Sequence, residues 1–219
     1  MKTVAFVPVK LNNERAPGKN TKQFGDGTPL ITHFLRTLVS VPEFDEVYVF
    51  CSDERIKEYI IPGVTFLKRP QTLDTKDATS QDIISSFIGM VTADVYAVCH
   101  CTSPFVKAER FSDCVNKVVN EKHDSAFTGE KIQRLMWYNG EPLNFDATNV
   151  PRTQDLPVYY NEVSATYVFK KETFETLRRR IGANPYICEV SGYECVDIDY
   201  PEDFEIANAI YMNIIRKEV

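Results

Sequence analysis

The 219-residue sequence lacks several features that mark whole classes of protein. No apolar run approaches the roughly 20 residues that a helix needs to cross a bilayer, which argues against a membrane protein. Residues 1–9 lack the basic region and the cleavage site of a secretory signal. We therefore expect a cytoplasmic protein with no membrane partner.

The six cysteines and three histidines form no recognisable metal-binding pattern. The sequence has no Cys-x-x-Cys pair and its histidines lie far apart, which argues against structural zinc. The cysteine content is too low for a small disulfide scaffold, so we expect reduced and mostly buried thiols. Cys99 and Cys101 are two apart in an apolar run and would share one face of a strand, which favours a packing role.

The chain also lacks an excess of positive charge, because its net charge is −6. A general nucleic-acid binder needs a basic face that displaces counterions from phosphates, so no nucleic-acid partner is expected. One segment opposes this balance, since residues 10–22 hold Lys10, Arg15, Lys19 and Lys22 against Glu14 alone. Any affinity for phosphate should therefore be local to this segment.

Expected strands alternate with expected helices along most of the chain, which is long enough for one substantial core. The alternation predicts an α/β fold with a mainly parallel sheet covered on both faces, as a single domain over residues 1–219. The expected strands are residues 3–9, 46–51, 64–67, 95–101, 125–128, 164–169 and two near Ile187 and Val196. The expected helices are residues 30–41, 54–60, 78–91 with Asp77 as its cap, 108–120, 172–180 and 201–216.

Residues 130–163 interrupt this alternation. Asn139-Gly140 is a dipeptide that closes two-residue hairpins, and the aromatic pair Trp137 and Tyr138 precedes it. We interpret the segment as an excursion that carries a hairpin. Its aromatic side chains either cover the core or contact a partner subunit, and the sequence leaves both interpretations open.

The basic segment directly follows the first expected strand, at the sheet edge where helix amino ends favour anions. Pro17-Gly18 allows a tight turn, and the basic side chains can neutralise a triphosphate as charge builds on leaving pyrophosphate. The Gly-x-x-x-x-Gly-Lys-Ser/Thr pattern of a Walker loop is absent. The alternative is a solvated basic loop that binds no ligand.

Asp197 and Asp199 precede the last expected helix. On a strand, their alternation places both carboxylates on one face, which suits a hard cation such as Mg²⁺ that also binds substrate phosphates. Alternatively, Asp199 caps the helix while Glu202 and Asp203 lie in its first turn. We assign Asp203 to the helix end.

Two more polar stretches end expected strands. Ser52 and Asp53 follow the second strand, and we favour Ser52 as a cap of the next helix. His100, Thr102 and Ser103 end a buried strand, where an imidazole and hydroxyls can reach a ligand. A histidine at such a place is as often structural as catalytic.

Together these segments resemble the acylneuraminate-type cytidylyltransferases, a family that includes the CMP-sialic acid and CMP-KDO synthetases. The resemblance covers nearly the whole chain, and its strength is the shared order of motifs that are weak one by one. The matching segments are Phe6-Val-Pro8-Val9-Lys10 with Arg15-Ala-Pro-Gly-Lys19-Asn20, Val49-Phe-Cys-Ser52-Asp53, Arg69-Pro70 with Asp77-Ala-Thr-Ser80, Thr102-Ser103-Pro104, Pro151-Arg152-x-Gln154-Asp155 and Asp197-Ile-Asp199.

The resemblance implies a Rossmann-like nucleotidyltransferase fold and a homodimer whose subunits each extend a hairpin toward the partner's site. It implies that the hydroxyl of a small acidic acceptor attacks the α-phosphate of CTP and that pyrophosphate leaves. The implied catalytic residues are Lys10, Arg15 and Lys19, and the implied Mg²⁺ ligands are Asp197 and Asp199. The implied nucleotide-binding residues are Pro8, Val9, Lys10, Asn20, Ser52, Asp53, Arg69, Ser80 and Thr102, and the implied acceptor-binding residues are His100, Ser103, Arg152 and Gln154.

Departures from the family pattern bear on the acceptor. Val106 and Asn161 stand where the sialic acid enzymes often carry arginine, a natural partner for a carboxylate. Lys107 or Arg152 could compensate, or the acceptor is another acidic sugar, a polyol phosphate or a phosphonate.

Two other functional classes stay open. A glycosyltransferase of similar architecture could use Asp197-x-Asp199 to bind a nucleotide sugar through a metal, although that motif usually follows a central strand. A catalytically silent nucleotide-binding protein could keep the same fold.

Overall fold

The computed structural model describes residues 1–13 and 15–218. Glu14, the acidic residue of the basic segment, lies outside the described residues. Within them, seven strands form one sheet in the order β3-β2-β1-β4-β8-β5-β9. The strands are β1 (Thr3–Val9), β2 (Glu46–Cys51), β3 (Val64–Lys68), β4 (Val95–Cys99), β5 (Ser125–Ile132), β8 (Tyr159–Lys170) and β9 (Pro185–Val190). Strand β8 runs antiparallel to both neighbours and every other pair is parallel, which confirms the mainly parallel sheet.

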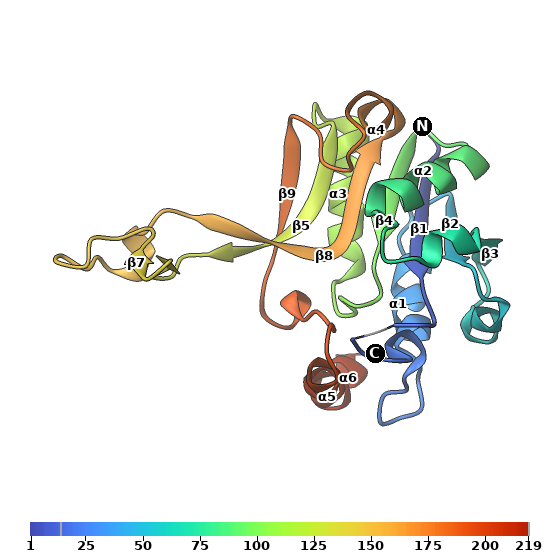
Figure 1. Cartoon of the computed structure of the whole chain (residues 1–219), viewed down its shortest axis with the longest axis horizontal. Coiled ribbons are helices and arrows are strands. Elements are labelled where there is room, and N and C mark those ends of the chain that lie inside the picture. The colour runs from blue at the N-terminus through green and yellow to red at the C-terminus, as the bar shows by residue number, and fades with distance from the viewer. Residues whose placement is uncertain (14, 219) are drawn as a thin grey trace.

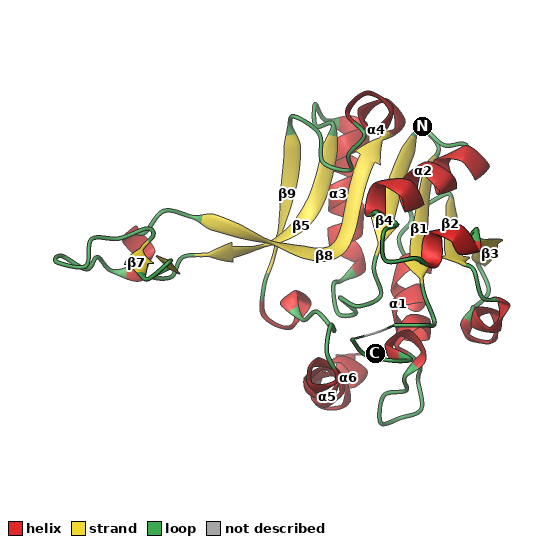
Figure 2. Cartoon of the chain, in the orientation of Figure 1, coloured by secondary structure: helices red, strands yellow, loops and turns green. Residues whose placement is uncertain are grey.

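Helices cover both faces of this sheet, which confirms the three-layer α/β/α architecture (Figure 2). On one face, α1 (Leu30–Val39) and α3 (Ala108–Asn120) pack buried side chains such as Phe34 and Phe111 against the strands. On the other face, α2 (Ser80–Met90) and α4 (Lys171–Leu177) contribute Phe87 and Phe174. Central strand β4 is buried along its whole length, as its continuous apolar sequence predicts.

The carboxyl-terminal helices form a third apolar cluster below the sheet edge. Helix α5 (Pro201–Ile210) continues as a π-helical turn (Tyr211–Ile215) and ends in α6 (Arg216–Glu218). Phe204 packs with Phe24, Phe105 and Ile198, which joins α5 to the loops after β1 and β4. This cluster holds the segment of residues 197–199 beside the basic loop.

Several expected boundaries are corrected by backbone hydrogen bonds. The expected strand at Val196 is wrong, because a 3₁₀ turn (Gly192–Cys195) precedes it and Ile198 N–H donates to the Thr102 carbonyl at 2.8 Å. Thr79, not Asp77, caps α2, and its hydroxyl and Asp82 form a capping box. The expected helix at residues 54–60 is a 3₁₀ helix (Glu54–Tyr59).

The excursion between β5 and β8 extends away from the body as an arm (Figure 1). It carries the hairpin of β6 (Trp137–Tyr138) and β7 (Glu141–Pro142), closed by Asn139 and Gly140 at φ 49° and 83°. The interpretation of its aromatic residues as core cover is wrong, because Trp137 is 60% and Tyr138 is 66% exposed. Contact with a partner subunit stays a prediction. In the described part of the chain, no helix is long and apolar enough to span a membrane.

Candidate active site

Three adjoining pockets lie where β1, β2 and β4 end, and Lys10 lines all three. The first has a volume of about 230 Å³ and is lined by both charged and apolar side chains. Its lining residues are Pro8, Lys10, Asn13, Lys19, Asn20, Arg69, Leu73, Ala78, Ile83, His100, Cys101 and Thr102. The second, of about 340 Å³, includes Ser52, Asp53 and Asp74. The third, of about 300 Å³, includes Arg15, Lys19 and Lys76. The folded chain thus gathers basic side chains from the loop after β1 around one hollow edge of the sheet.

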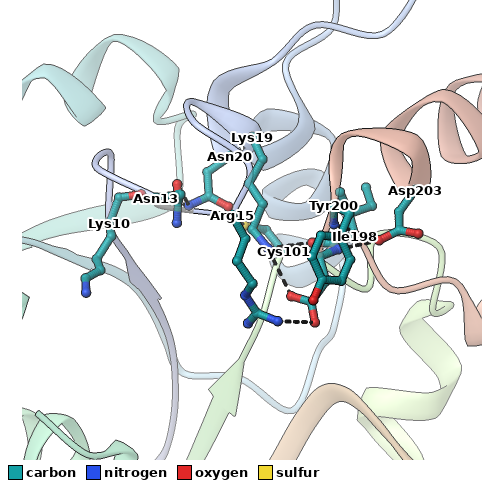
Figure 3. A network of polar contacts seen from close by, with 10 residues as sticks. Lys10, Asn13, Arg15, Lys19, Asn20, Cys101, Ile198, Tyr200 and Asp203 are labelled. Carbon is teal, nitrogen blue, oxygen red and sulfur yellow. Dashed lines mark hydrogen bonds and ion pairs between the residues drawn. The ribbon is translucent and has the colours of Figure 1, made fainter. Parts of the chain in front are cut away.

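An ion-pair network ties the basic loop to the carboxyl-terminal segment. Lys19 Nζ donates to the Ile198 carbonyl at 2.5 Å and lies 3.3 Å from Asp199 Oδ1, while Arg15 Nη1 lies 3.1 Å from Asp199 Oδ2. Figure 3 shows Arg15 and Lys19 reaching toward the segment of Ile198 and Tyr200. The Lys19 side chain is 11% exposed and that of Arg15 is 61% exposed, so Lys19 is the more firmly placed of the two cations.

Asp199 is not the cap of the last helix. The Asp203 carboxylate accepts hydrogen bonds from the backbone N–H groups of Asp199 and Tyr200, at 2.9 and 2.7 Å. The assignment of Asp203 to the helix end is therefore confirmed, and the Asp199 carboxylate is left for Arg15 and Lys19. Asp197 is exposed, and buried Ile198 separates it from Asp199.

Asn20 braces the basic loop from within. Its amide donates to the Lys10 carbonyl at 2.8 Å, and its side-chain oxygen accepts a hydrogen bond from the Cys101 thiol at 3.5 Å. Burial raises the pKa of Cys101 to about 12, so this group remains a thiol and not a nucleophile. Asn20 therefore fixes the loop relative to β4, while its side chain also lines the first pocket.

Arg69 is a buried cation on the wall of the first pocket. It is 2% exposed, and its Nη2 donates to Asp74 Oδ1 at 2.6 Å. Its Nε, also buried, makes no hydrogen bond to the described residues. A buried guanidinium with an unsatisfied donor at a pocket wall can donate a hydrogen bond to a ligand oxygen or ring nitrogen. Asp74, which the sequence did not single out, is the group that orients it.

His100 lines the same pocket as a neutral imidazole. Burial, together with the nearby charge of Arg180, lowers the pKa of His100 to about 4. Its Nδ1 lies 2.7 Å from the Ser164 carbonyl, which can only accept, so Nδ1 carries the proton. The remaining nitrogen, Nε2, is therefore a hydrogen-bond acceptor and not a cation.

Several predicted residues lie outside the pockets. Ser103 lies in the turn after His100 and is fully buried, and its hydroxyl has no hydrogen-bond partner among the described residues. Its contact with an acceptor stays a prediction. Ser80 is exposed on the first turn of α2 and bonds to Gln81. The Val9 side chain is buried in the core, which leaves only its backbone for a ligand.

The cap after β2 is Asp53 and not Ser52. The Asp53 carboxylate accepts from the Arg55 backbone N–H at 3.0 Å and also pairs with the Arg55 guanidinium. Ser52 is left half-buried on the wall of the second pocket. The prediction of Ser52 as the cap is wrong because a carboxylate one residue later competes for the same backbone donor.

Arg152 and Gln154 lie on the arm and do not reach these pockets in their own chain. Arg152 pairs with Asp155 three residues away at 2.8 Å, and the Gln154 backbone carbonyl accepts from Gln133. A role for either residue at an acceptor therefore requires the arm of a second subunit.

A larger cavity of about 600 Å³ lies apart from this edge. It is bounded by α1, the turn after Ser103 and the carboxyl-terminal helices, and Lys107 lines it. Its lining shares no residue with the three pockets around Lys10.

Comparison with known proteins identifies a family for this chain. A family model of the cytidylyltransferases matches residues 4–217. An N-acylneuraminate cytidylyltransferase of Oncorhynchus mykiss is 25% identical over 214 residues, 93% of this chain and 49% of that protein. The 3-deoxy-manno-octulosonate cytidylyltransferase 2 of Hydrogenovibrio crunogenus (strain DSM 25203 / XCL-2) is 25% identical over 250 residues, 96% of this chain and 98% of that protein.

The chain spans about half the length of the N-acylneuraminate cytidylyltransferases that it matches. Among solved structures, a CMP:2-keto-3-deoxy-manno-octonic acid synthetase complexed with CTP superposes with a TM-score of 0.71, at 18% identity and 100% coverage of both chains. That likeness confirms the α/β nucleotidyltransferase fold. Since the family model covers nearly every residue of the chain, the protein belongs to the cytidylyltransferase family.

Proposed function

We propose that this chain transfers CMP from CTP to a hydroxyl of a small acidic sugar or related acceptor and releases pyrophosphate. The observation that carries the proposal is the convergence of Lys10, Arg15 and Lys19 on adjoining pockets beside Asp199. Family membership and the relatives that act on N-acylneuraminate and 3-deoxy-manno-octulosonate support the same reaction class.

The basic residues would act on the phosphates of CTP. In the structure, Asp199 holds Arg15 and Lys19 at the rim of the pockets, so both cations are positioned before a ligand arrives. A triphosphate would take over these cations, and they would offset the negative charge that grows on leaving pyrophosphate. Lys10, common to all three pockets, would act on the α-phosphate, while Arg69 and Thr102 on the first pocket would hold the nucleoside.

Asp197 and Asp199 fit a magnesium site by their donor set. Both offer carboxylate oxygens, which Mg²⁺ prefers, and Asp199 already contacts Arg15 and Lys19, the cations proposed for the phosphates. Among the described residues no group of three or more His, Cys, Asp or Glu side chains could hold a metal alone, so phosphate oxygens or water would supply the other ligands. Bound there, Mg²⁺ would neutralise phosphate charge and lower the pKa of the acceptor hydroxyl.

We further propose that the protein works as a homodimer. The arm extends away from the body (Figure 1). Its residues include Arg152, Gln154 and the exposed Trp137, Tyr138 and Val150. A second subunit could place these two polar residues over the acceptor. A cytoplasmic location is supported by the six cysteines, which are free thiols.

The reaction is tested by Mg²⁺-dependent release of pyrophosphate from CTP, UTP, ATP and GTP with a panel of acceptors. The panel holds 2-keto sugar acids, polyol phosphates and phosphonates. Release with CTP and one acceptor would establish the activity and name the substrate. Calorimetry with CTP alone gives the second readout, and a chain that neither releases pyrophosphate nor binds CTP would refute the proposal.

The homodimer is tested by analytical ultracentrifugation of the wild-type chain and of a Trp137→Asp, Tyr138→Asp double variant. Both side chains are exposed, so the variant should keep its fold. We expect a dimer for the wild type and a monomer for the variant, because two carboxylates cannot be buried in an apolar contact. A wild-type monomer at working concentrations would refute the dimer.

A further inference from the structure

An acidic acceptor needs a cation near the nucleotide pocket, and the candidates from the sequence do not lie there. Val106 and Asn161 carry no charge, and Val106 is 1% exposed. Lys107 lines the separate cavity beside α1. Arg152 is on the arm, where it pairs with Asp155. Within one subunit, the partner of an acceptor oxyanion is therefore some other residue.

Arg180 is the cation that the fold brings to this place. It follows α4 in the sequence, yet its guanidinium carbon lies 3.5 Å from the centroid of the Tyr167 ring on β8. The Tyr167 ring meets the His100 ring edge to face, with centroids 6.1 Å apart and an interplanar angle of 80°. Since His100 lines the first pocket, Arg180 stands one aromatic ring beyond the predicted nucleotide site.

The local contacts hold the Arg180 guanidinium in position but leave N–H donors for a ligand. In the described part of the chain, its one carboxylate contact is Glu162, at 3.9 Å from Nη2, which is too long for a hydrogen bond. The same Glu162 carboxylate accepts a 2.7 Å hydrogen bond from the Tyr167 hydroxyl. The Arg180 side chain is 26% exposed, so water or a ligand can reach it.

The positive charge of Arg180 contributes to the lowered pKa of His100, which lines the first pocket. It acts with burial to keep His100 neutral, so His100 offers Nε2 as an acceptor and supplies no positive charge of its own. The two residues are thus complementary: His100 accepts a hydrogen bond, from a hydroxyl for example, and Arg180 offers N–H donors in a planar fork. A sugar that carries both hydroxyls and an oxyanion presents the matching groups.

We propose that Arg180, stacked on Tyr167 next to His100, binds an oxyanion of the acceptor and selects acidic acceptors over neutral ones. This inference rests on the proposed cytidylyl transfer. Stacking on the ring pre-orients the guanidinium, so a carboxylate or phosphate can be bound through two parallel N–H···O bonds without first ordering a mobile side chain. Glu162, held by Tyr167, then acts as the weak partner that keeps Arg180 in place until the acceptor arrives.

The test compares the wild-type chain with Arg180→Gln and Arg180→Lys, and uses Arg179→Gln as a matched control. Arg179, one residue away, contacts the Gly182 carbonyl instead of the Tyr167 ring. For each variant we would measure kcat and the KM for CTP and for the acceptor, with 3-deoxy-manno-octulosonate and its methyl ester as one pair and a polyol phosphate and its free polyol as the other. The two pairs separate a carboxylate from a phosphate as the group that is bound.

We expect Arg180→Gln to raise the acceptor KM about 10-fold to 100-fold, the effect of losing a charge-assisted hydrogen bond, with little change in the KM for CTP. The preference for the acid over its uncharged counterpart should fall by the same factor. Arg180→Lys should recover part of it because it keeps the charge, and Arg179→Gln should match the wild type.

If the wild type is active and Arg180→Gln keeps the wild-type KM for the acceptor, the inference on Arg180 is overturned while the proposed function stands. A variant with equal losses toward CTP and acceptor would also overturn it, since that result marks a structural role. A wild type that releases no pyrophosphate with any panel member would overturn the proposed function, and the inference with it.

Discussion

Replacement of Lys19 by methionine separates a catalytic role from a structural one. The Lys19 ammonium binds the Ile198 carbonyl at 2.5 Å and Asp199 at 3.3 Å, and its side chain is 11% exposed. Methionine keeps most of the apolar stem and removes the ammonium, with its charge and its N–H donors. Loss of one preorganised donor at developing charge costs about 100-fold to 1,000-fold in turnover, so we expect a fall of that size in pyrophosphate release.

The effect on folding should be much smaller. A hydrogen bond to a charged group contributes about 1.5–3 kcal/mol, and methionine recovers part of this because no ammonium has to be desolvated. We therefore expect a loss of about 1–2 kcal/mol, or a fall in Tm of about 2–8 °C for a chain of this length. A domain with about 5–15 kcal/mol of stability would remain almost entirely folded, so unfolding cannot explain the loss of turnover.

Lys22→Met is the matched control for this experiment. Lys22 lies three residues further on, pairs with Glu205 at 2.9 Å and is 43% exposed. An exposed ion pair of this kind is worth about 0–1 kcal/mol, so this variant should be nearly as stable and as active as the wild type. Pyrophosphate release at saturating CTP and a thermal melt would be measured for both. Undiminished turnover in Lys19→Met, or equal losses in the two variants, would remove Lys19 from the proposed site.

Two further predictions concern Asp199 and His100. Asp199→Asn frees Arg15 and Lys19 from their carboxylate, so calorimetry without Mg²⁺ should show CTP binding at least as tight as in the wild type, while Mg²⁺-dependent turnover falls about 100-fold or more. Weaker metal-free binding of CTP would contradict this account of the ion pairs. The pKa of His100 is lowered from 6.5 to about 4, so the unfolded chain binds a proton that the folded chain does not, and stability should fall as pH drops from about 6.5 to 4, by at most about 3 kcal/mol from this group. Urea titrations should show a shallower decline for His100→Gln, but not a flat one, because burial also lowers the pKa of His33 to about 4; an unchanged decline would mean that His100 is protonated in the folded state.

The regular elements were predictable where a single physical signal dominates. Strands at residues 3–9 and 46–51 and the helix at 108–120 agree with the structure at both ends, because a buried apolar run or a helical repeat of apolar residues is bounded by turn or polar residues. The β5 strand extends four residues beyond its expected end at Thr128, because its polar continuation pairs with β8 at the base of the arm. Pairing between distant strands leaves little trace in local hydrophobicity.

The residue that caps each helix was also not predictable from local sequence. Asp77, Ser52 and Asp199 are each plausible caps by residue type, yet Thr79, Asp53 and Tyr200 hold the cap positions. Neighbouring polar side chains compete for the same few backbone donors. Which side chain caps the helix depends on the direction in which the chain enters the helix, and tertiary packing sets that direction.

The sequence by itself determined the order of the elements, the basic loop after the first strand and its acidic counterpart near the carboxyl end, because these depend on local composition and periodicity. Only the tertiary structure decided which of these groups meet. It joined Arg15 and Lys19 to Asp199, more than 170 residues away, buried Ser103, and placed Arg180 on Tyr167 beside His100. Such contacts arise from the packing of α5 below the sheet edge and from the antiparallel return of β8, and no short stretch of sequence contains that information.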